Sequence, residues 1–148
     1  MAFLTNSILL VFIFLISNST YADEFHLELS RYDNKQVLLL VYHNGYSNKA
    51  FNKRALCLSG LGGLKLEISD IAGVKYPKAA LINDRCKLHE VIELEPFGVY
   101  GKFVNDVTFE STYGLKTGTY NVKAIMCDYG SDPQNCLESN SISITIEN

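Results

Sequence analysis

The sequence has no excess of positive charge. Its 148 residues include 13 Lys and Arg against 16 Asp and Glu, which gives a formal net charge of −3. Proteins that bind nucleic acid through its phosphates carry a surplus of Lys and Arg, so this balance argues against a nucleic-acid partner. Apolar residues make up 47% of the chain, an ordinary share for a globular protein, so general disorder is excluded as well.

Familiar catalytic and ligand-binding motifs are also missing. The sequence has no Gly-x-Ser-x-Gly nucleophile elbow, and Gly60, Gly62 and Gly63 are not followed by the Lys-Ser/Thr of a phosphate loop. These glycines are typical of a hairpin or interstrand loop. His26 and His89 fall on the polar phase of alternating segments, which predicts solvent-facing side chains. We therefore predict no catalytic residue, no metal ligand and no cofactor.

No apolar run is long enough to span a membrane. The longest covers residues 8–16, whereas a spanning helix needs about 20 residues. Polar residues follow it, and then Thr20-Tyr21-Ala22, which places small residues at a signal-peptidase site. The first six residues carry no Lys or Arg, unlike most signals, so an uncleaved anchor is the alternative. We predict a secretory signal at residues 1–22 and one domain at residues 23–148, secreted or periplasmic, without membrane contact after cleavage.

The four cysteines fit an exported chain. Cys57, Cys86, Cys127 and Cys136 are an even number, which favours disulfides outside the cytosol. Four cysteines allow three connectivities, and we favour Cys57–Cys86 with Cys127–Cys136 because turn-forming residues separate the second pair. Zinc is the rival interpretation, but the chain has no Cys-x-x-Cys pair. Two disulfides are therefore expected.

Apolar and polar residues alternate along most of the chain, as in strands with one wet face. The clearest alternations cover residues 25–30, 64–68, 119–127 and 141–147, and residues 37–42 form a continuous apolar run typical of a central strand. Further strands are expected at residues 54–58, 74–76, 88–94 and 102–109. No stretch of eleven or more residues has helical spacing, and turn residues recur often. The pattern predicts an all-β, antiparallel immunoglobulin-like β-sandwich of about 7–8 strands.

Short motifs between residues 64 and 124 resemble those of a known family. They are an Asp-x-x-Gly turn at Asp70, Val-Lys-Tyr-Pro at residues 74–77, Leu-x-Pro-x-Gly at residues 94–98 and an aromatic element at residues 113–122. This layout resembles the amino-terminal, propeptide-type domain of the deuterolysin-like (aspzincin) metalloendopeptidases, an exported immunoglobulin-like domain. Aromatic elements similar to the one at residues 113–122 occur in other bacterial β-sandwich proteins, including small proteinase inhibitors. The resemblance implies that Leu115 and Tyr120 fill the core where Gly118 permits a bend.

The zinc protease domain of that family has no counterpart in this chain. It requires a His-Glu-x-x-His helix, whereas His89-Glu90 continues with Val91-Ile92-Glu93, so Glu stands where the second His is needed. Peptidase activity cannot be carried over. The resemblance therefore implies a free-standing relative of a domain that accompanies or restrains an enzyme.

Two segments predicted to be loops carry residues that commonly anchor protein interfaces. Residues 42–54 include Tyr46, Phe51 and Arg54, and Tyr129 lies between Cys127 and Cys136. Aromatic and Arg side chains on loops are frequent interface anchors. We predict that these four residues contact a protein partner.

The favoured function is a non-enzymatic, exported protein-binding module that is monomeric or weakly oligomeric. One form of such a module is an inhibitor or immunity-type partner of a secreted hydrolase or protease. A structural or adhesive surface subunit is the first alternative, suggested by the regular strand at residues 141–147, whose edge could pair with a neighbour. An enzyme of unrecognised type is the second.

Overall fold

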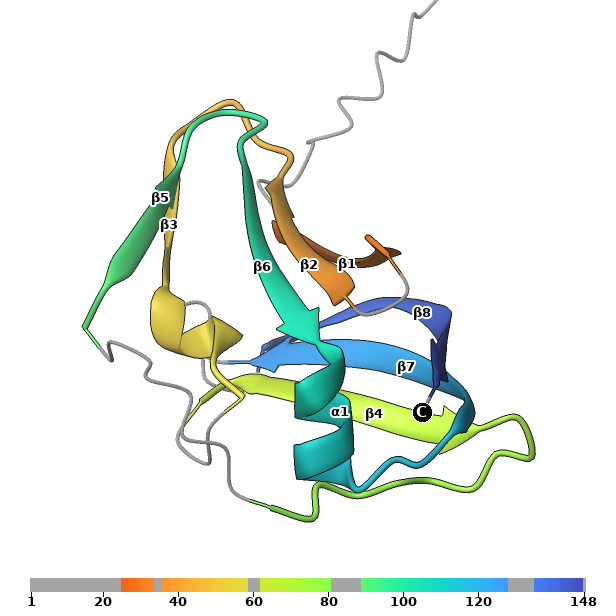
Figure 1. Cartoon of the computed structure of the whole chain (residues 1–148). Coiled ribbons are helices and arrows are strands. Elements are labelled where there is room, and N and C mark those ends of the chain that lie inside the picture. Colours follow the sequence, from red (N-terminus) through yellow and green to blue (C-terminus); the bar gives the residue numbers. More distant parts are fainter. Residues whose placement is uncertain (1–24, 34–35, 59–61, 81–88, 128–134, 148) are drawn as a thin grey trace, which may run out of the picture.

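The computed structural model describes residues 25–33, 36–58, 62–80, 89–127 and 135–147 (Figure 1). These residues form eight strands, a 3₁₀ helix and an α-helix: β1 (Phe25–Arg31), β2 (Gln36–His43), β3 (Lys49–Asn52), η1 (Lys53–Leu56), β4 (Leu64–Asp70), β5 (Val91–Leu94), β6 (Val99–Asn105), α1 (Asp106–Tyr113), β7 (Gly118–Cys127) and β8 (Cys136–Ile146). The paired strands are antiparallel. A mostly β, antiparallel fold is thus confirmed, while the immunoglobulin-like topology stays a prediction. The predicted leader lies outside the described residues.

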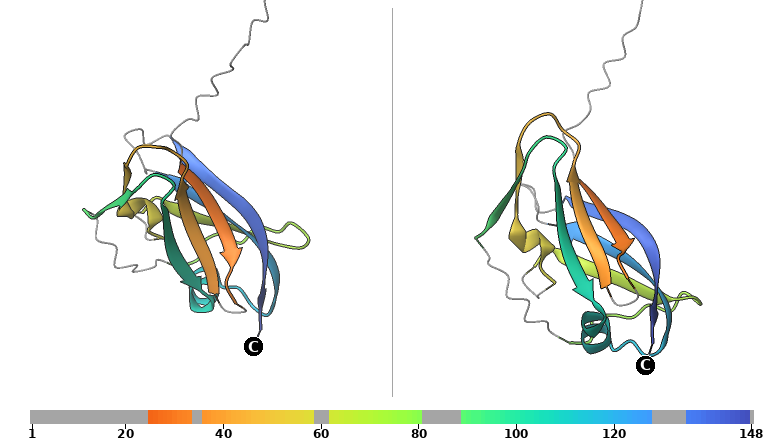
Figure 2. Two further views of the ribbon diagram at one scale, coloured as in Figure 1. Left: turned by 90° about the horizontal axis from the view of Figure 1, so that it is seen from above. Right: turned by 45° about the horizontal axis from the view of Figure 1, so that its top comes forward.

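The strands form two three-stranded sheets and a two-stranded ribbon (Figure 2). The strand order is β1-β2-β6 in one sheet and β4-β7-β8 in the other, while β3 pairs with β5. Alternate residues of both sheets point into one core, among them Leu29, Leu39, Val104, Leu66, Val122 and Ile144. In the ribbon, β3 follows β2 along the chain and β5 precedes β6. The apolar residues of the ribbon therefore reach the same core.

One side chain joins the two sheets along the edge where β1 and β8 lie side by side. The Asn140 side chain of β8 accepts a hydrogen bond from the Leu29 backbone N–H at 2.7 Å and donates one to the Leu29 carbonyl oxygen at 2.9 Å. The amide therefore occupies the place of a neighbouring strand and satisfies both outward-facing backbone groups of Leu29. This edge of β1 is consequently not free to pair there with another chain.

Three predicted strands are wrong in whole or in part. Residues 74–76 were expected to be a strand, but they form only an isolated bridge between Lys75 and Ser69. Residues 54–58 were expected to be a strand, but Lys53–Leu56 form η1, which begins where the Asn52 side chain accepts a hydrogen bond from the Arg54 backbone N–H at 3.0 Å. Residues 102–109 were expected to be a strand throughout, but β6 ends at Asn105 and α1 follows. In the last two cases an Asn side chain caps the new helix by binding a backbone N–H that no helical carbonyl can reach.

The caps of α1 explain its length. The Asn105 side chain accepts a hydrogen bond from the Thr108 backbone N–H at 3.1 Å, and Gly114 ends the helix with a left-handed φ of 63°. Glycine adopts this conformation without the steric cost of a Cβ atom. Leu115 and Tyr120, which follow, are buried as the resemblance implied.

The predicted Cys127–Cys136 disulfide is confirmed, with an S–S distance of 2.00 Å. Cys57 is fully buried, but Cys86 lies outside the described residues, so their pairing stays a prediction. The backbone is crowded near Cys57 and Cys127, because a Cβ atom at Gly63 would lie 2.1 Å from the Cys127 carbonyl oxygen. The close approach of these chain segments therefore requires glycine at position 63.

Candidate functional site

The outer face of the β1-β2-β6 sheet carries a group of neighbouring apolar side chains. Strand β2 presents Leu38, Leu40 and Tyr42 outward, and β6 presents Val99 and Phe103 beside them. All five side chains are half-buried or exposed, and the exposed Tyr32 ring, next to the end of β1, meets the Phe103 ring edge-on at a centroid distance of 5.0 Å. We call these five residues the apolar face. Polar residues of this outer surface lie on β1, where His26 and Glu28 are exposed, and at one end of the sheet, where Gln36 of β2 stands opposite Asn105 of β6.

The outer face of the other sheet provides a comparison within the same molecule. Its outward positions carry mainly charged, amide and hydroxyl side chains, such as Lys65, Glu67, Asn121, Lys123 and Ser143. Such side chains are well hydrated, and a polar outer face is the usual pattern for an antiparallel sheet that packs on one side only. The apolar face therefore departs from what the core of this domain requires.

A glycine and a hydrogen bond shape the apolar face. Gly101 of β6 lies directly under Leu38 and Leu40, since a Cβ atom there would approach a methyl carbon of each leucine to 3.3 Å. The two leucines thus spread over β6. The pKa of Tyr42 is raised, first by burial of its hydroxyl and then by its hydrogen bond to Glu28. This bond fixes the ring at the boundary between the apolar and polar parts of the sheet.

A tight turn stands at the end of the sheet, between β5 and β6. The Gly98 backbone N–H donates to the Glu95 carbonyl oxygen at 2.8 Å, and Phe97 has a positive φ of 59°. Pro96 followed by a residue with positive φ is the arrangement of a type II turn, whose third position favours Gly or Asn. Phe97 occupies that position instead. A left-handed conformation costs a residue with a side chain roughly 1–2 kcal/mol.

A buried histidine holds this turn against β2. His43 has no exposed surface, and its backbone N–H donates to the Gly98 carbonyl oxygen at 3.0 Å. Its ring Nδ1 lies 3.3 Å from the Glu95 carbonyl oxygen, so a proton on Nδ1 completes a second hydrogen bond. The His43 ring also packs against Phe25 at 5.6 Å. The turn is therefore anchored from beneath at both of its ends.

The strained residue belongs to an exposed aromatic pair. The Tyr46 ring, from the loop between β2 and β3, meets the Phe97 ring edge-on at a centroid distance of 5.1 Å. Tyr46 is 76% exposed and Phe97 58% exposed. Figure 1 shows the two connecting segments side by side at the top of the molecule. We call Tyr46 and Phe97 the apical pair. Strand β6 begins two residues after Phe97, and its first residue is Val99 of the apolar face.

The other predicted partner-binding residues do not join this surface. Phe51 lies on β3, is only 2% exposed and packs against Phe25, so the interpretation of residues 42–54 as a loop is wrong at β3 and the Phe51 ring belongs to the core. Arg54 is exposed on η1, at the opposite end of β3 from Tyr46. Tyr129 lies outside the described residues.

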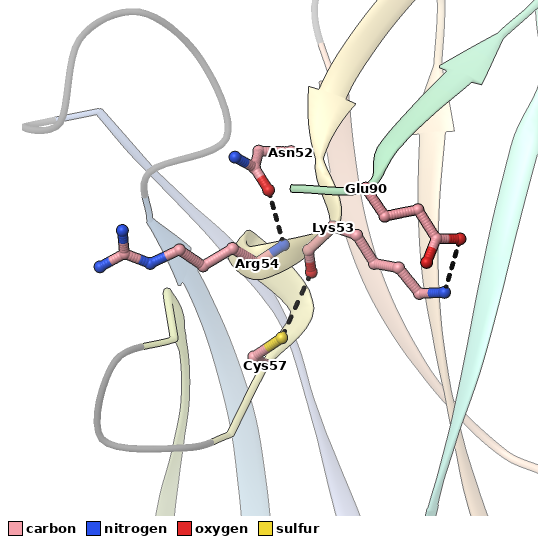
Figure 3. A network of polar contacts seen from close by, with 5 residues as sticks. All are labelled: Asn52, Lys53, Arg54, Cys57 and Glu90. Carbon is pink, nitrogen blue, oxygen red and sulfur yellow. Dashed lines mark hydrogen bonds and ion pairs between the residues drawn. The ribbon is translucent and has the colours of Figure 1, made fainter. Parts of the chain in front are cut away.

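Figure 3 shows the surroundings of Arg54. The Lys53 ammonium donates to the Glu90 carboxylate at 2.9 Å, and the Cys57 sulfur lies 3.5 Å from the Lys53 carbonyl oxygen. The Arg54 side chain extends away from Asn52, Lys53 and Glu90. The hydrogen bond to Glu90 is the main cause that raises the pKa of Lys53. This network fixes η1 to the start of β5 and leaves Arg54 at the surface.

Tyr46 was predicted from the sequence as a partner contact, whereas Phe97 and the apolar face were not. The available signal for Phe97 was Pro96-Phe97-Gly98 between two apolar segments, which indicates a turn with a large residue where glycine is usual. For the apolar face, the signal was the continuous apolar run at residues 37–42. That run was interpreted as a central strand, and β2 is indeed the central strand of its sheet. The apolar residues on its outward side were not assigned a role.

Over the described ranges, no group of His, Cys, Asp and Glu side chains could hold a metal ion, and no helix there is long and apolar enough to cross a membrane. Comparison with models of protein families gives no match, and comparison with curated proteins gives none either.

Proposed function

We propose that this protein is a non-enzymatic, exported binding module that holds a partner protein on the apolar face and the apical pair. The observation that carries the proposal is the contrast between the two sheets: one outer face is polar, and the other exposes aliphatic and aromatic side chains from neighbouring strands. Contiguous apolar patches on a soluble protein commonly mark interaction sites. The kind of binding module that we favour is an inhibitor or immunity protein that binds a secreted hydrolase.

The apical pair supports the proposal independently. Interface hot spots are enriched in large aromatic residues that lose water completely on binding. Phe97 exposes most of its ring although its backbone conformation is costly, and strained residues concentrate at binding sites. The pair stands at the end of the apolar face, so one partner can cover both. Buried His43 keeps the turn rigid, which lowers the ordering entropy that binding must overcome.

The finer predictions about fold and compartment remain part of this proposal. The Tyr120 hydroxyl donates to the Lys116 carbonyl oxygen at 2.9 Å, which is the arrangement of a tyrosine corner and favours an immunoglobulin-like sandwich. The Cys127–Cys136 disulfide favours an oxidising compartment. The proposal also includes a second disulfide, Cys57–Cys86, and removal of a leader at residues 1–22.

Site-specific photo-crosslinking in the native host tests the proposed surface. A photoreactive phenylalanine analogue replaces Phe97 or Phe103 in the full chain, and as a control Val91, which is 57% exposed on β5. We expect one partner protein to be crosslinked from positions 97 and 103 and not from position 91. Crosslinking to a second copy of this chain favours the structural or adhesive alternative. Equal crosslinking from all three positions, or none, overturns the proposal.

A matched pair of substitutions then measures the energy of the contact. Val99→Thr places a hydroxyl in the apolar face, and Val91→Thr makes the same change at a similarly exposed valine elsewhere. We expect only Val99→Thr to weaken capture of the crosslinked partner, because a desolvated hydroxyl without a hydrogen bond costs about 1–3 kcal/mol. Equal effects of the two substitutions would contradict the assignment.

A further inference from the structure

A separate pocket lies on the polar outer face of the β4-β7-β8 sheet. Its volume is about 360 Å³, within the range of small-molecule sites. The floor comes from neighbouring strands, since Glu67 of β4 stands opposite Lys123 of β7, and Ser69 opposite Asn121. Ser141 of β8, opposite Lys123, extends the floor to the third strand. The pocket is thus on the other sheet from the apolar face.

The wall of the pocket is the segment that turns back along β4 (Figure 1). The Asp70 carboxylate accepts hydrogen bonds from the backbone N–H groups of Ala72 and Val74, both at 2.9 Å, and so shapes the turn. The Tyr76 backbone N–H then donates to the Ile68 carbonyl oxygen at 2.8 Å. These bonds hold the segment against the sheet edge and make a concave site from a flat sheet.

Several polar side chains of the pocket have no hydrogen-bond or ion-pair partner among the residues that the structure describes. Over the ranges that the structure describes, no hydrogen bond or ion pair involves the side chains of Ser69, Asn121, Ser141 or Lys75. Asn140, close by on β8, binds backbone groups and shows the alternative use of an amide in this fold. The pocket therefore offers hydroxyl, amide and ammonium groups that are all available to a ligand.

The charges in the pocket balance. Lys123 forms an ion pair with Glu138, and that contact is the main cause that raises the pKa of the Lys123 ammonium. Of the other charged residues in the lining, Lys75 carries a positive and Glu67 a negative charge, so together with the Lys123–Glu138 pair the charges cancel. A pocket without net charge does not favour phosphate or sulfate groups, which bind where positive charge is in excess. A neutral ligand rich in hydroxyl groups suits this lining better.

We propose that this pocket binds a neutral saccharide. The hydroxyl groups of the sugar would exchange hydrogen bonds with the floor residues Ser69, Asn121 and Ser141, and its C–H surface would pack on Tyr76 and Pro77. The Tyr76 ring is held in place by edge-on contact with Tyr120 at 5.3 Å. This site is independent of the proposed partner surface, so the protein would bind a glycan on one sheet and a protein on the other.

Amide chemical-shift mapping of the isotope-labelled full-length protein tests the inference. The probes are glucose, galactose, mannose, N-acetylglucosamine and their short oligomers, with glucose 6-phosphate, glucuronic acid and glucosamine as charged comparators. We expect a neutral sugar to shift resonances of residues 67–69 and 121–123 at millimolar concentration, and each charged comparator to bind more weakly. No shift in this region with any neutral sugar, or tighter binding of a charged comparator, overturns the proposal.

Two serines on β8 give a matched control. Ser141 and Ser143 are both exposed and two residues apart, but only Ser141 lines the pocket. We expect Ser141→Ala and Asn121→Ala each to weaken sugar binding about fivefold, the effect of losing one hydrogen bond, and Ser143→Ala to leave it unchanged. Equal effects of the two serine substitutions overturn the assignment. Crosslinking from positions 97 and 103 reports on the partner surface separately.

Discussion

Replacing Phe97 by glycine and by alanine should separate backbone strain from ring contacts. Both substitutions remove the same aromatic ring and the same edge-on contact with Tyr46. They differ only in the Cβ atom, which alanine keeps in the left-handed conformation that Phe97 adopts. We expect the glycine variant to be the more stable of the two, the reverse of the usual order of these residues.

The size of this difference in stability follows from two opposing contributions to the free energy of unfolding. Alanine in a left-handed conformation costs roughly 1–2 kcal/mol. Glycine costs about 0.4–1 kcal/mol through the greater freedom of the unfolded chain. The difference favours the glycine variant by about 1 kcal/mol, which corresponds to roughly 4 °C in midpoint temperature for a domain of this size. Gly98 is not a suitable site for the same comparison, because a Cβ atom there would lie 2.8 Å from the Glu95 carbonyl oxygen.

Urea unfolding followed by tyrosine fluorescence and circular dichroism measures this difference, since the chain has no Trp. If the unfolding free energies of the two variants fall with urea concentration at the same slope, unfolding exposes a similar surface area in both. Both variants should lose partner binding to the same degree, because both lack the ring. An alanine variant as stable as the glycine variant would refute the left-handed conformation of Phe97. Unchanged partner binding would remove Phe97 from the proposed surface.

Three further predictions concern stability. Asn140→Ala should lower the free energy of unfolding by about 1–3 kcal/mol in urea titration, because the backbone N–H and carbonyl of Leu29 lose their partner; an effect below 0.5 kcal/mol would contradict the bridging role. Gly63→Ala should cost more than 2 kcal/mol in the same assay, since the new Cβ atom would overlap the Cys127 carbonyl oxygen. Burial raises the pKa of the Tyr113 hydroxyl, so the unfolded chain releases this proton first and stability, complete below pH 10, falls as the pH rises further. Tyr113→Phe should therefore flatten the alkaline decline in unfolding free energy, and an unchanged decline would exclude this residue as its source.

Strands that alternate over many residues could be predicted from sequence, and short helices could not. Alternation along residues 64–68 matches β4, because each inward side chain there meets the core and each outward one meets water. The same test failed at Val107 and Phe109, which were expected on one side of a strand. In α1 they lie on opposite sides, with Val107 exposed and Phe109 buried. The Asn105 cap, and not the periodicity, decides the structure there.

The candidate site depends on contacts that sequence spacing does not reveal. Phe51 was assigned to a loop because its pairing partner, Ile92 of β5, lies far along the chain. The left-handed φ of Phe97 is imposed by the turn and by His43 beneath it. Tyr46 was identified because an exposed loop follows the turn residues His43-Asn44-Gly45, a local signal. Its aromatic neighbour, in contrast, comes from a different connection.

Stability alone would not produce the surface that we assign to a partner. The core uses only the inward side of β2, so polar residues in place of Leu38 and Leu40 would leave it intact. Glycine in place of Phe97 would remove strain without touching a buried side chain. Two unrelated departures from the most stable choice thus occur on one sheet and the turn at its end. A partner that buries the apolar face and the exposed ring accounts for both, because burial of this apolar area contributes binding energy that offsets the cost of the strained residue.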